Sequence, residues 1–125
     1  MKITHLDHLV LTVSSIEESC RFYEQVLGME VIRFGEGRTA LKFGNQKINL
    51  HETGKEFEPK AATPTAGSGD LCFITESSVK EITAHLAKLG VEIEEGPVKR
   101  TGALGKMDSV YLRDPDGNLL EVLSY

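Results

Sequence analysis

Five side chains of the kinds that bind metal ions or carry protons lie in segments that are otherwise aliphatic. They are His8, Asn49, His51, Asp70 and Glu121. A polar group on the inner face of a sheet is costly unless it is paired or bound to something. Imidazole nitrogen with carboxylate oxygen suits a divalent ion, whether Zn²⁺, Ni²⁺, Mn²⁺, Co²⁺ or Fe²⁺. These residue types indicate a metal site, in which a carboxylate such as Glu121 could also move a proton.

Side chains alternate along a strand, so the neighbours of each candidate predict its face. The neighbours are aliphatic or aromatic: Leu9 and Leu11 around His8, Ile48 and Leu50 around Asn49 and His51, Leu71 and Phe73 around Asp70, Leu120 and Val122 around Glu121. We expect these neighbours to form the face that packs on a helix. The candidates, together with Tyr111, Arg113 and Cys72, should share the opposite face.

The elements that would position these residues occur twice. The expected strands are 6–13, 30–34, 39–43 and 47–51 in one unit, and 70–75, 91–94, 109–113 and 119–123 in the other. After the first strand of each unit, Ser15 or Ser78 begins a helix and Gly28 or Gly90 ends it. The predicted fold class is α+β: two tandem βαβββ units that form a curved mixed sheet, a half-barrel with a cavity, with the helices outside.

The duplication pairs positions as well as elements. We expect one domain, 1–125, built of units 1–53 and 69–125 joined by a Gly-, Pro- and Ser-containing linker, 54–68. His8 corresponds to Asp70, and, beyond an insertion of about ten residues in the second unit, Asn49 corresponds to Glu121. The inserted stretch 99–106 is basic and Gly-rich. It is expected to be a loop that either covers the cavity and holds an anionic substrate group, with Lys106 as a candidate, or stays solvated.

Composition excludes several classes of function. A net charge of −5 with no long basic run argues against a nucleic-acid surface. The apolar run 9–11 is far too short for a signal segment or a membrane span, so no membrane partner is expected. Cys20 and Cys72 are expected to be reduced thiols in a cytoplasmic protein.

Three segments resemble the vicinal-oxygen-chelate superfamily, which includes glyoxalase I, extradiol dioxygenases, fosfomycin-resistance enzymes and bleomycin-binding proteins. They are Asp7–Leu11, Phe22–Met29 and Tyr111–Glu121, the last containing Asp-Pro-Asp-Gly-Asn with Glu four residues after the Gly. More narrowly, Gln46–Glu52 resembles a small glyoxalase-domain subgroup, some members of which carry dioxygenase-related or virulence-protein labels.

The resemblance implies metal ligands at His8 and Glu121. It also places Asp70 where the family usually has His, and Asn49 where glyoxalase I has Glu. His51, two residues beyond Asn49, faces the same way. The ligand set is then either His8, His51 and Glu121 or the more oxygen-rich His8, Asp70 and Glu121. Asn49, Tyr111, Arg113 and Lys106 are candidate substrate-binding residues.

Two functions remain open from the sequence. One is a metal-dependent enzyme acting on a small oxygenated molecule, as a glyoxalase-type lyase or a dioxygenase-related enzyme, with Glu121 as the catalytic proton carrier. The other is a metal-free protein that sequesters a small molecule, as in bleomycin resistance. The resemblance also implies a homodimer.

Overall fold

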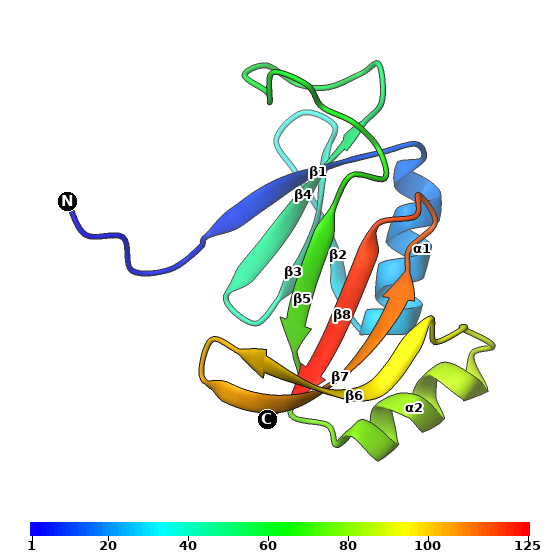
Figure 1. Cartoon of the computed structure of the whole chain (residues 1–125). Helices are drawn as coiled ribbons and strands as arrows, with labels where there is room; N and C mark the ends of the chain where they lie inside the picture. The colour runs from blue at the N-terminus through cyan, green and yellow to red at the C-terminus, as the bar shows by residue number, and fades with distance from the viewer. The chain divides into compact units, whose positions relative to one another are not determined.

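The structure, a computed structural model, describes residues 1–125 and divides into two compact units, Met1–Gly67 and Ser68–Tyr125. The first unit contains β1 (His8–Val13), α1 (Ile16–Leu27), β2 (Glu30–Phe34), β3 (Arg38–Phe43) and β4 (Gln46–Glu52). The second contains β5 (Asp70–Ile74), α2 (Val79–Lys88), β6 (Glu95–Gly102), β7 (Gly105–Arg113) and β8 (Leu119–Ser124). The predicted α+β class with two βαβββ units is confirmed (Figure 1).

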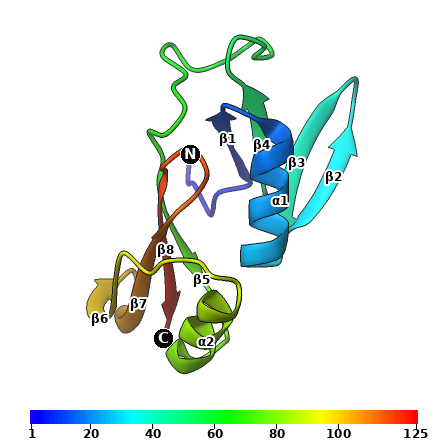
Figure 2. The ribbon, with the colours of Figure 1, turned by 90° about the vertical axis from the view of Figure 1, so that its right-hand side faces the viewer.

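The first unit is a mixed four-stranded sheet with strand order β1-β4-β3-β2, in which only β1 and β4 are parallel. Helix α1 contacts β2, β3 and β4 and covers one face of the sheet (Figure 2). That face and the apolar stripe of α1 form the core, whose buried members are Leu11, Val13, Leu41, Ile48, Leu50, Cys20, Tyr23 and Val26. Burial of these side chains orients the sheet, so the alternate side chains face away from α1.

The second unit repeats this plan with strand order β5-β8-β7-β6 and a parallel β5–β8 pair. Helix α2 contacts β7, and the buried side chains of this unit include Ile82 and Leu86 of α2, Val110 and Leu112 of β7, and Leu120 of β8. Neither helix is long and apolar enough to span a membrane.

Both helices have the predicted ends. Ser15 accepts a hydrogen bond from the Glu18 backbone N–H, and Gly28 ends α1 in the left-handed conformation at φ 67°. Ser78 and Glu81 form a complete capping box at α2, with both reciprocal hydrogen bonds present. Gly90 follows α2 with φ 69°, a conformation that favours glycine.

The expectation of a loop at 99–106 is wrong, because these residues belong to a hairpin. β6 and β7 pair from Glu95 to Gly102, with Lys99 opposite Asp108 and Gly102 opposite Gly105. The Lys99 ammonium lies 2.6 Å from the Asp108 carboxylate, which ties the two strands together. Composition indicated a loop, whereas strand pairing makes this stretch an extension of the sheet.

The strand expected at 91–94 is also misplaced. The Val91 backbone N–H donates to the Leu86 carbonyl at 2.9 Å and therefore completes the end of α2. Pairing with β7 starts only where the Glu94 N–H reaches the Tyr111 carbonyl at 2.8 Å. The helix end thus occupies residues that the apolar pattern assigned to the strand.

Candidate functional site

In the first unit, the face that points away from α1 carries the three predicted polar side chains. Across the parallel β1–β4 pair, His8 lies opposite Lys47, Asn49 opposite Val10, and His51 opposite Thr12. The alternation predicted from the sequence therefore holds for His8, Asn49 and His51.

His8 lies at the start of β1, where its ring is oriented by a carboxylate. Its Nδ1 is 2.7 Å from Asp7 Oδ2, and this hydrogen bond is the main cause of a lowered pKa at Asp7. A carboxylate on one ring nitrogen is the usual partner of a metal-binding histidine, because it fixes the ring and directs the other nitrogen outward. The Nε2 atom of His8 is thereby available as a metal ligand.

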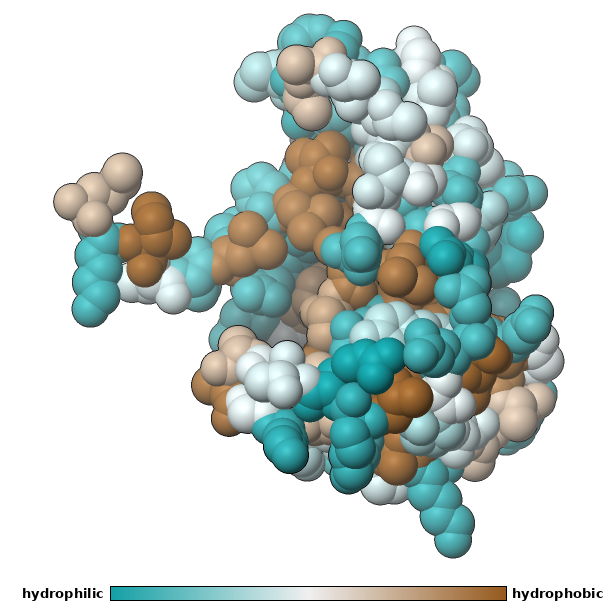
Figure 3. All heavy atoms as spheres, viewed as in Figure 1, coloured by the Kyte–Doolittle hydropathy of each residue, from teal (hydrophilic) through white to brown (hydrophobic).

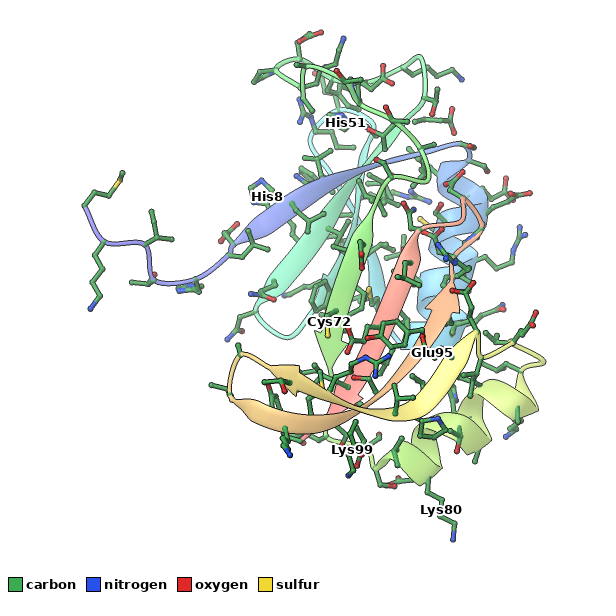
Figure 4. The ribbon with its side chains drawn as sticks, in the orientation of Figure 1. His8, His51, Cys72, Lys80, Glu95 and Lys99 are labelled. Carbon is green, nitrogen blue, oxygen red and sulfur yellow. The ribbon has the colours of Figure 1, made fainter.

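His51 lies at the far end of the same strand pair (Figure 4). It is four positions along the ladder from His8, roughly 13 Å at the usual rise of a strand. The ring is buried and meets the edge of Phe57 at 5.7 Å between centroids. Burial, and then the nearby Arg38, lowers the pKa of His51, so its imidazole is neutral at pH 7. The structure does not bring His51 and His8 together.

Asn49 occupies the middle of this face between small apolar neighbours. It is opposite Val10 on one side and Ala40 on the other. Its Oδ1 atom is buried and has no hydrogen-bond partner. A buried amide oxygen without a partner costs free energy, so this atom is suited to a ligand that can donate to it or coordinate it.

In the second unit, Glu121 occupies the position that Asn49 has in the first. It lies between Cys72 of β5 and Tyr111 of β7, directly opposite both. Asp70 lies two positions away on β5, diagonal to Glu121, as His8 lies diagonal to Asn49. The strand register therefore gives each unit one diagonal pair of polar side chains, as the repeat predicted.

The Glu121 carboxylate interacts with two neighbouring side chains, Ser109 and Cys72. The Ser109 hydroxyl donates to Glu121 Oε2. Burial, and then the charge and hydrogen bonding of Glu121, raises the pKa of the Cys72 thiol to about 11, although part of the residue is exposed. Cys72 is therefore protonated at pH 7. Sequence reasoning assigned Ser109 no role, although its strand parity with Tyr111 placed it on this face.

Of the two cations predicted to bind substrate in the second unit, Arg113 is bound to a carboxylate and Lys106 faces away from Glu121. The Arg113 guanidinium makes two hydrogen bonds to Glu94, at 2.9 and 3.0 Å. Side chains alternate along β7, so Met107, Ser109 and Tyr111 share one face and Lys106 points to the other. Tyr111 instead receives a hydrogen bond at its hydroxyl from Arg100 Nε at 3.2 Å, and Arg100 is held in turn by Glu95 at 3.0 Å.

Each of the two units carries donor types that divalent ions accept. His8 offers an imidazole nitrogen, Asp70 and Glu121 offer carboxylate oxygens, and Asn49 offers an amide oxygen without a partner. The structure contains no group of three or more His, Cys, Asp or Glu side chains that could hold a metal ion.

Comparison with known proteins gives one family and several full-length relatives. The family model described as Glyoxalase/Bleomycin resistance protein/Dioxygenase superfamily matches residues 5–122. The virulence protein STM3117 of Salmonella typhimurium is 54% identical over 125 residues, which cover all of this chain and 87% of that protein. The glyoxalase domain-containing protein RDO1 of Mycosarcoma maydis is 53% identical over the whole chain and 70% of its own length.

Solved structures agree with this result. The crystal structure of STM3117 superposes with a TM-score of 0.99 and covers 100% of this chain and 99% of that one. An integron cassette protein from the mobile metagenome of V. cholerae is 60% identical, with a TM-score of 0.98 and coverage of 100% and 98%. None of these names states a reaction.

Proposed function

The chain belongs to the glyoxalase/bleomycin resistance protein/dioxygenase superfamily, and from this premise we propose that it is a metal-dependent enzyme acting on a small oxygenated molecule. The reaction is that of a glyoxalase-type lyase or of a dioxygenase-related enzyme. The observation that supports it most is the polar cluster on the open face of the second unit. There Glu121 lies diagonal to Asp70 and accepts a hydrogen bond from Ser109.

The proposed metal donors are His8, Asp70 and Glu121, with the amide oxygen of Asn49 as a further donor or a substrate contact. His51 is left out of this set because it lies four positions along the ladder from His8. Of the two ligand sets that the sequence left open, we propose the oxygen-rich one, because the strand register separates His51 from His8. Zn²⁺, Ni²⁺, Mn²⁺, Co²⁺ and Fe²⁺ all accept such donors.

A bound divalent ion would supply Lewis-acid chemistry, polarising adjacent oxygens of the substrate. The side chains of this protein would do the rest. Glu121 takes and returns the proton, and the Ser109 hydroxyl holds its carboxylate in place. The Tyr111 hydroxyl, fixed by Arg100, contacts the substrate from the neighbouring strand. Arg113 can bind the substrate only if its hydrogen bonds to Glu94 break.

An activity panel tests this proposal. Metal-loaded protein should turn over at least one of three substrate types: methylglyoxal–thiol adducts, catechols or epoxides. The Glu121→Gln variant should then lose about 10²–10⁴-fold in kcat, the usual contribution of general acid–base catalysis. Glu92→Gln is the matched control, because Glu92 is an exposed carboxylate just before β6. Equal kcat values for the two variants would remove Glu121 from the reaction.

A metal-free binding protein is the second candidate, and two residues favour it. By the resemblance, Asn49 stands where glyoxalase I has Glu and Asp70 where the family usually has His, so the donor set is weaker than in glyoxalase I. This candidate predicts saturable binding of a small molecule with no turnover of any panel substrate. Binding should then be unchanged after treatment with a chelator.

We further propose a cytoplasmic homodimer. Both cysteines are free, as expected in a reducing compartment. Exposed apolar side chains gather near the N-terminus, namely Met1, Ile3, Leu6 and Val10, and Figure 3 shows brown spheres along this arm. Such a patch favours association with a second copy, and sedimentation of the full chain with and without residues 1–6 tests it.

A further inference from the structure

His51 is a buried histidine without a protein partner on the open face of the first unit. It lies where β4 ends (Figure 4), and only 5% of the residue is exposed. Its ring meets the edge of Phe57 but forms no hydrogen bond or ion pair. A buried polar group without a partner costs free energy, so the imidazole is suited to a ligand that hydrogen-bonds to it.

Arg38 lies beside His51 on the same face. Thr39 of β3 is directly opposite Leu50 of β4, and both are buried in the core. Because side chains alternate along a strand, the next residue of each strand, Arg38 and His51, points to the open face. Arg33 at the other end of the same turn is opposite Thr39 and so points the other way.

The ring of Phe57 holds Arg38 and His51 at one place. The Arg38 guanidinium is 4.5 Å from the centroid of this ring, and the His51 ring centroid is 5.7 Å from it. Phe57 follows β4 in the chain, where the Thr53 backbone N–H donates to the Val13 carbonyl at 2.9 Å. An aromatic face orients a guanidinium without cancelling its charge. Arg38 is therefore ordered, and its positive charge stays available.

The charges around this cluster leave it positive. Arg38 forms no ion pair, in contrast to Arg100 and Arg113. A second cation, the Lys47 ammonium, lies 3.9 Å from the centroid of the Phe34 ring, and Phe34 is directly opposite Arg38. The Glu56 carboxylate also acts on His51, but it accepts a backbone hydrogen bond at 2.9 Å and forms no ion pair with Arg38.

We propose that Arg38 and His51 together bind the oxyanion group, a carboxylate or a phosphate, of a small organic ligand. The planar guanidinium offers two parallel N–H donors to such a group. The imidazole adds a further N–H donor in either of its protonation states. Phe34, which is half-buried beside Arg38, offers an apolar contact to the rest of the ligand. His51 is four ladder positions from His8, so this site does not depend on the proposed metal donors.

NMR titration of the chelator-treated full chain with benzoate, and separately with phenyl phosphate, tests the proposal. We expect saturable shifts of the His51 ring signals and of the Arg38 Nε–H signal. Arg38→Gln should raise Kd about tenfold or more, as the loss of a charged hydrogen bond does. R38K keeps the charge without the planar fork and should bind with intermediate affinity. His51→Phe keeps a ring but loses its N–H donor, and should raise Kd about three- to tenfold.

Arg33→Gln is the matched control, because Arg33 belongs to the same turn and points to the other face of the hairpin. This variant should bind like the wild type, and so should the double variant H8A/E121Q, which separates the site from the metal proposal. The ligand with the lower Kd identifies the preferred oxyanion. Uncharged benzyl alcohol should not bind. No saturable shift with either anion, equal effects of R33Q and R38Q in folded variants, or equal binding of benzyl alcohol would overturn the proposal.

Discussion

At the scale of the residue, neighbours decide which groups are charged on the open face of the second unit. Cys72 and Glu121 lie directly opposite each other, and a thiol beside a carboxylate in a partly buried place keeps its proton. Cys72 is therefore a neutral donor to Glu121 and not a nucleophile at pH 7. Ser109 is a second neutral donor to the same carboxylate.

Alkylation of Cys72 by iodoacetamide should follow this raised pKa. In chelator-treated protein its rate should climb with pH toward a midpoint near 11, because only the thiolate reacts. Mass spectrometry of the modified peptide separates Cys72 from Cys20. Glu121→Gln removes the opposing negative charge and should speed the reaction at pH 8–9. A Cys72 midpoint at the ordinary value of about 8.5 in the wild type would contradict this picture.

His51 should titrate at a lower pH than an exposed histidine. Burial and Arg38 lower its pKa, which two-dimensional NMR of the four imidazoles can measure. Arg38→Gln removes the repelling charge and should raise the pKa of His51. Arg21→Gln is the control within the same unit: Arg21 is ion-paired to Glu17 on α1 and does not act on His51, so this variant should leave the pKa of His51 unchanged.

The lowered pKa of His51 also makes the free energy of unfolding depend on pH. Because the folded-state pKa of His51 lies below the unfolded value of about 6.5, the unfolded chain binds the proton more readily. The stability that His51 contributes is complete above that value and is lost as pH falls toward the folded-state pKa. His51→Gln should therefore flatten the fall in unfolding free energy between pH 7 and 5. An unaltered slope would show that His51 is not buried as a neutral ring.

At the scale of the element, the turn at 114–118 fixes the β7–β8 hairpin to the start of β5. Asp114 accepts hydrogen bonds from the backbone N–H groups of Asp116 and Asn118, both at 2.9 Å. The fully buried Asn118 donates to Asp114 at 2.7 Å and accepts from the Gly69 N–H at 2.6 Å. The turn thus positions Asp70 relative to Glu121.

Asn118→Ala should destabilise the protein by about 1–3 kcal/mol, the cost of leaving buried polar groups unpaired. Urea unfolding followed by circular dichroism measures this change. Asn45→Ala is the matched control, because Asn45 is an exposed turn residue between β3 and β4 and should change stability by less than about 0.5 kcal/mol. Equal effects of the two variants would exclude the network as a source of stability.

The elements that sequence reasoning located correctly have strong local signals. Ser15, Gly28, Ser78 and the Asp-Pro-Asp-Gly-Asn turn each specify a backbone conformation through a few nearby atoms. The hairpin of β6 and β7 has no such signal. Its pairing depends on a partner several residues away, as with Lys99 and Asp108, and Gly-rich composition conceals it.

At the scale of the whole molecule, the duplication gives the two units the same register and different chemistry. The strand pairs place Asn49 where the second unit has Glu121, and His8 where it has Asp70. Alternation and repeat spacing were sufficient to predict these faces. Arg100 and Arg113 form ion pairs, whereas Arg33 and Arg38 form none. Which arginine meets a carboxylate depends on how the side chains lie in space, and residue spacing does not encode this.

The central claim is that His8 and Glu121 bind a divalent metal ion. Elemental analysis of protein purified without chelator, by inductively coupled plasma mass spectrometry, tests it most directly. The account predicts close to one equivalent of a first-row divalent metal in the wild type, and at most a tenth of that in His8→Ala and in Glu121→Gln. The control variants His85→Ala and Glu92→Gln, both outside the strands that carry Asp70 and Glu121, should retain the metal. A wild type that holds no more metal than the H8A/E121Q double variant would contradict the claim.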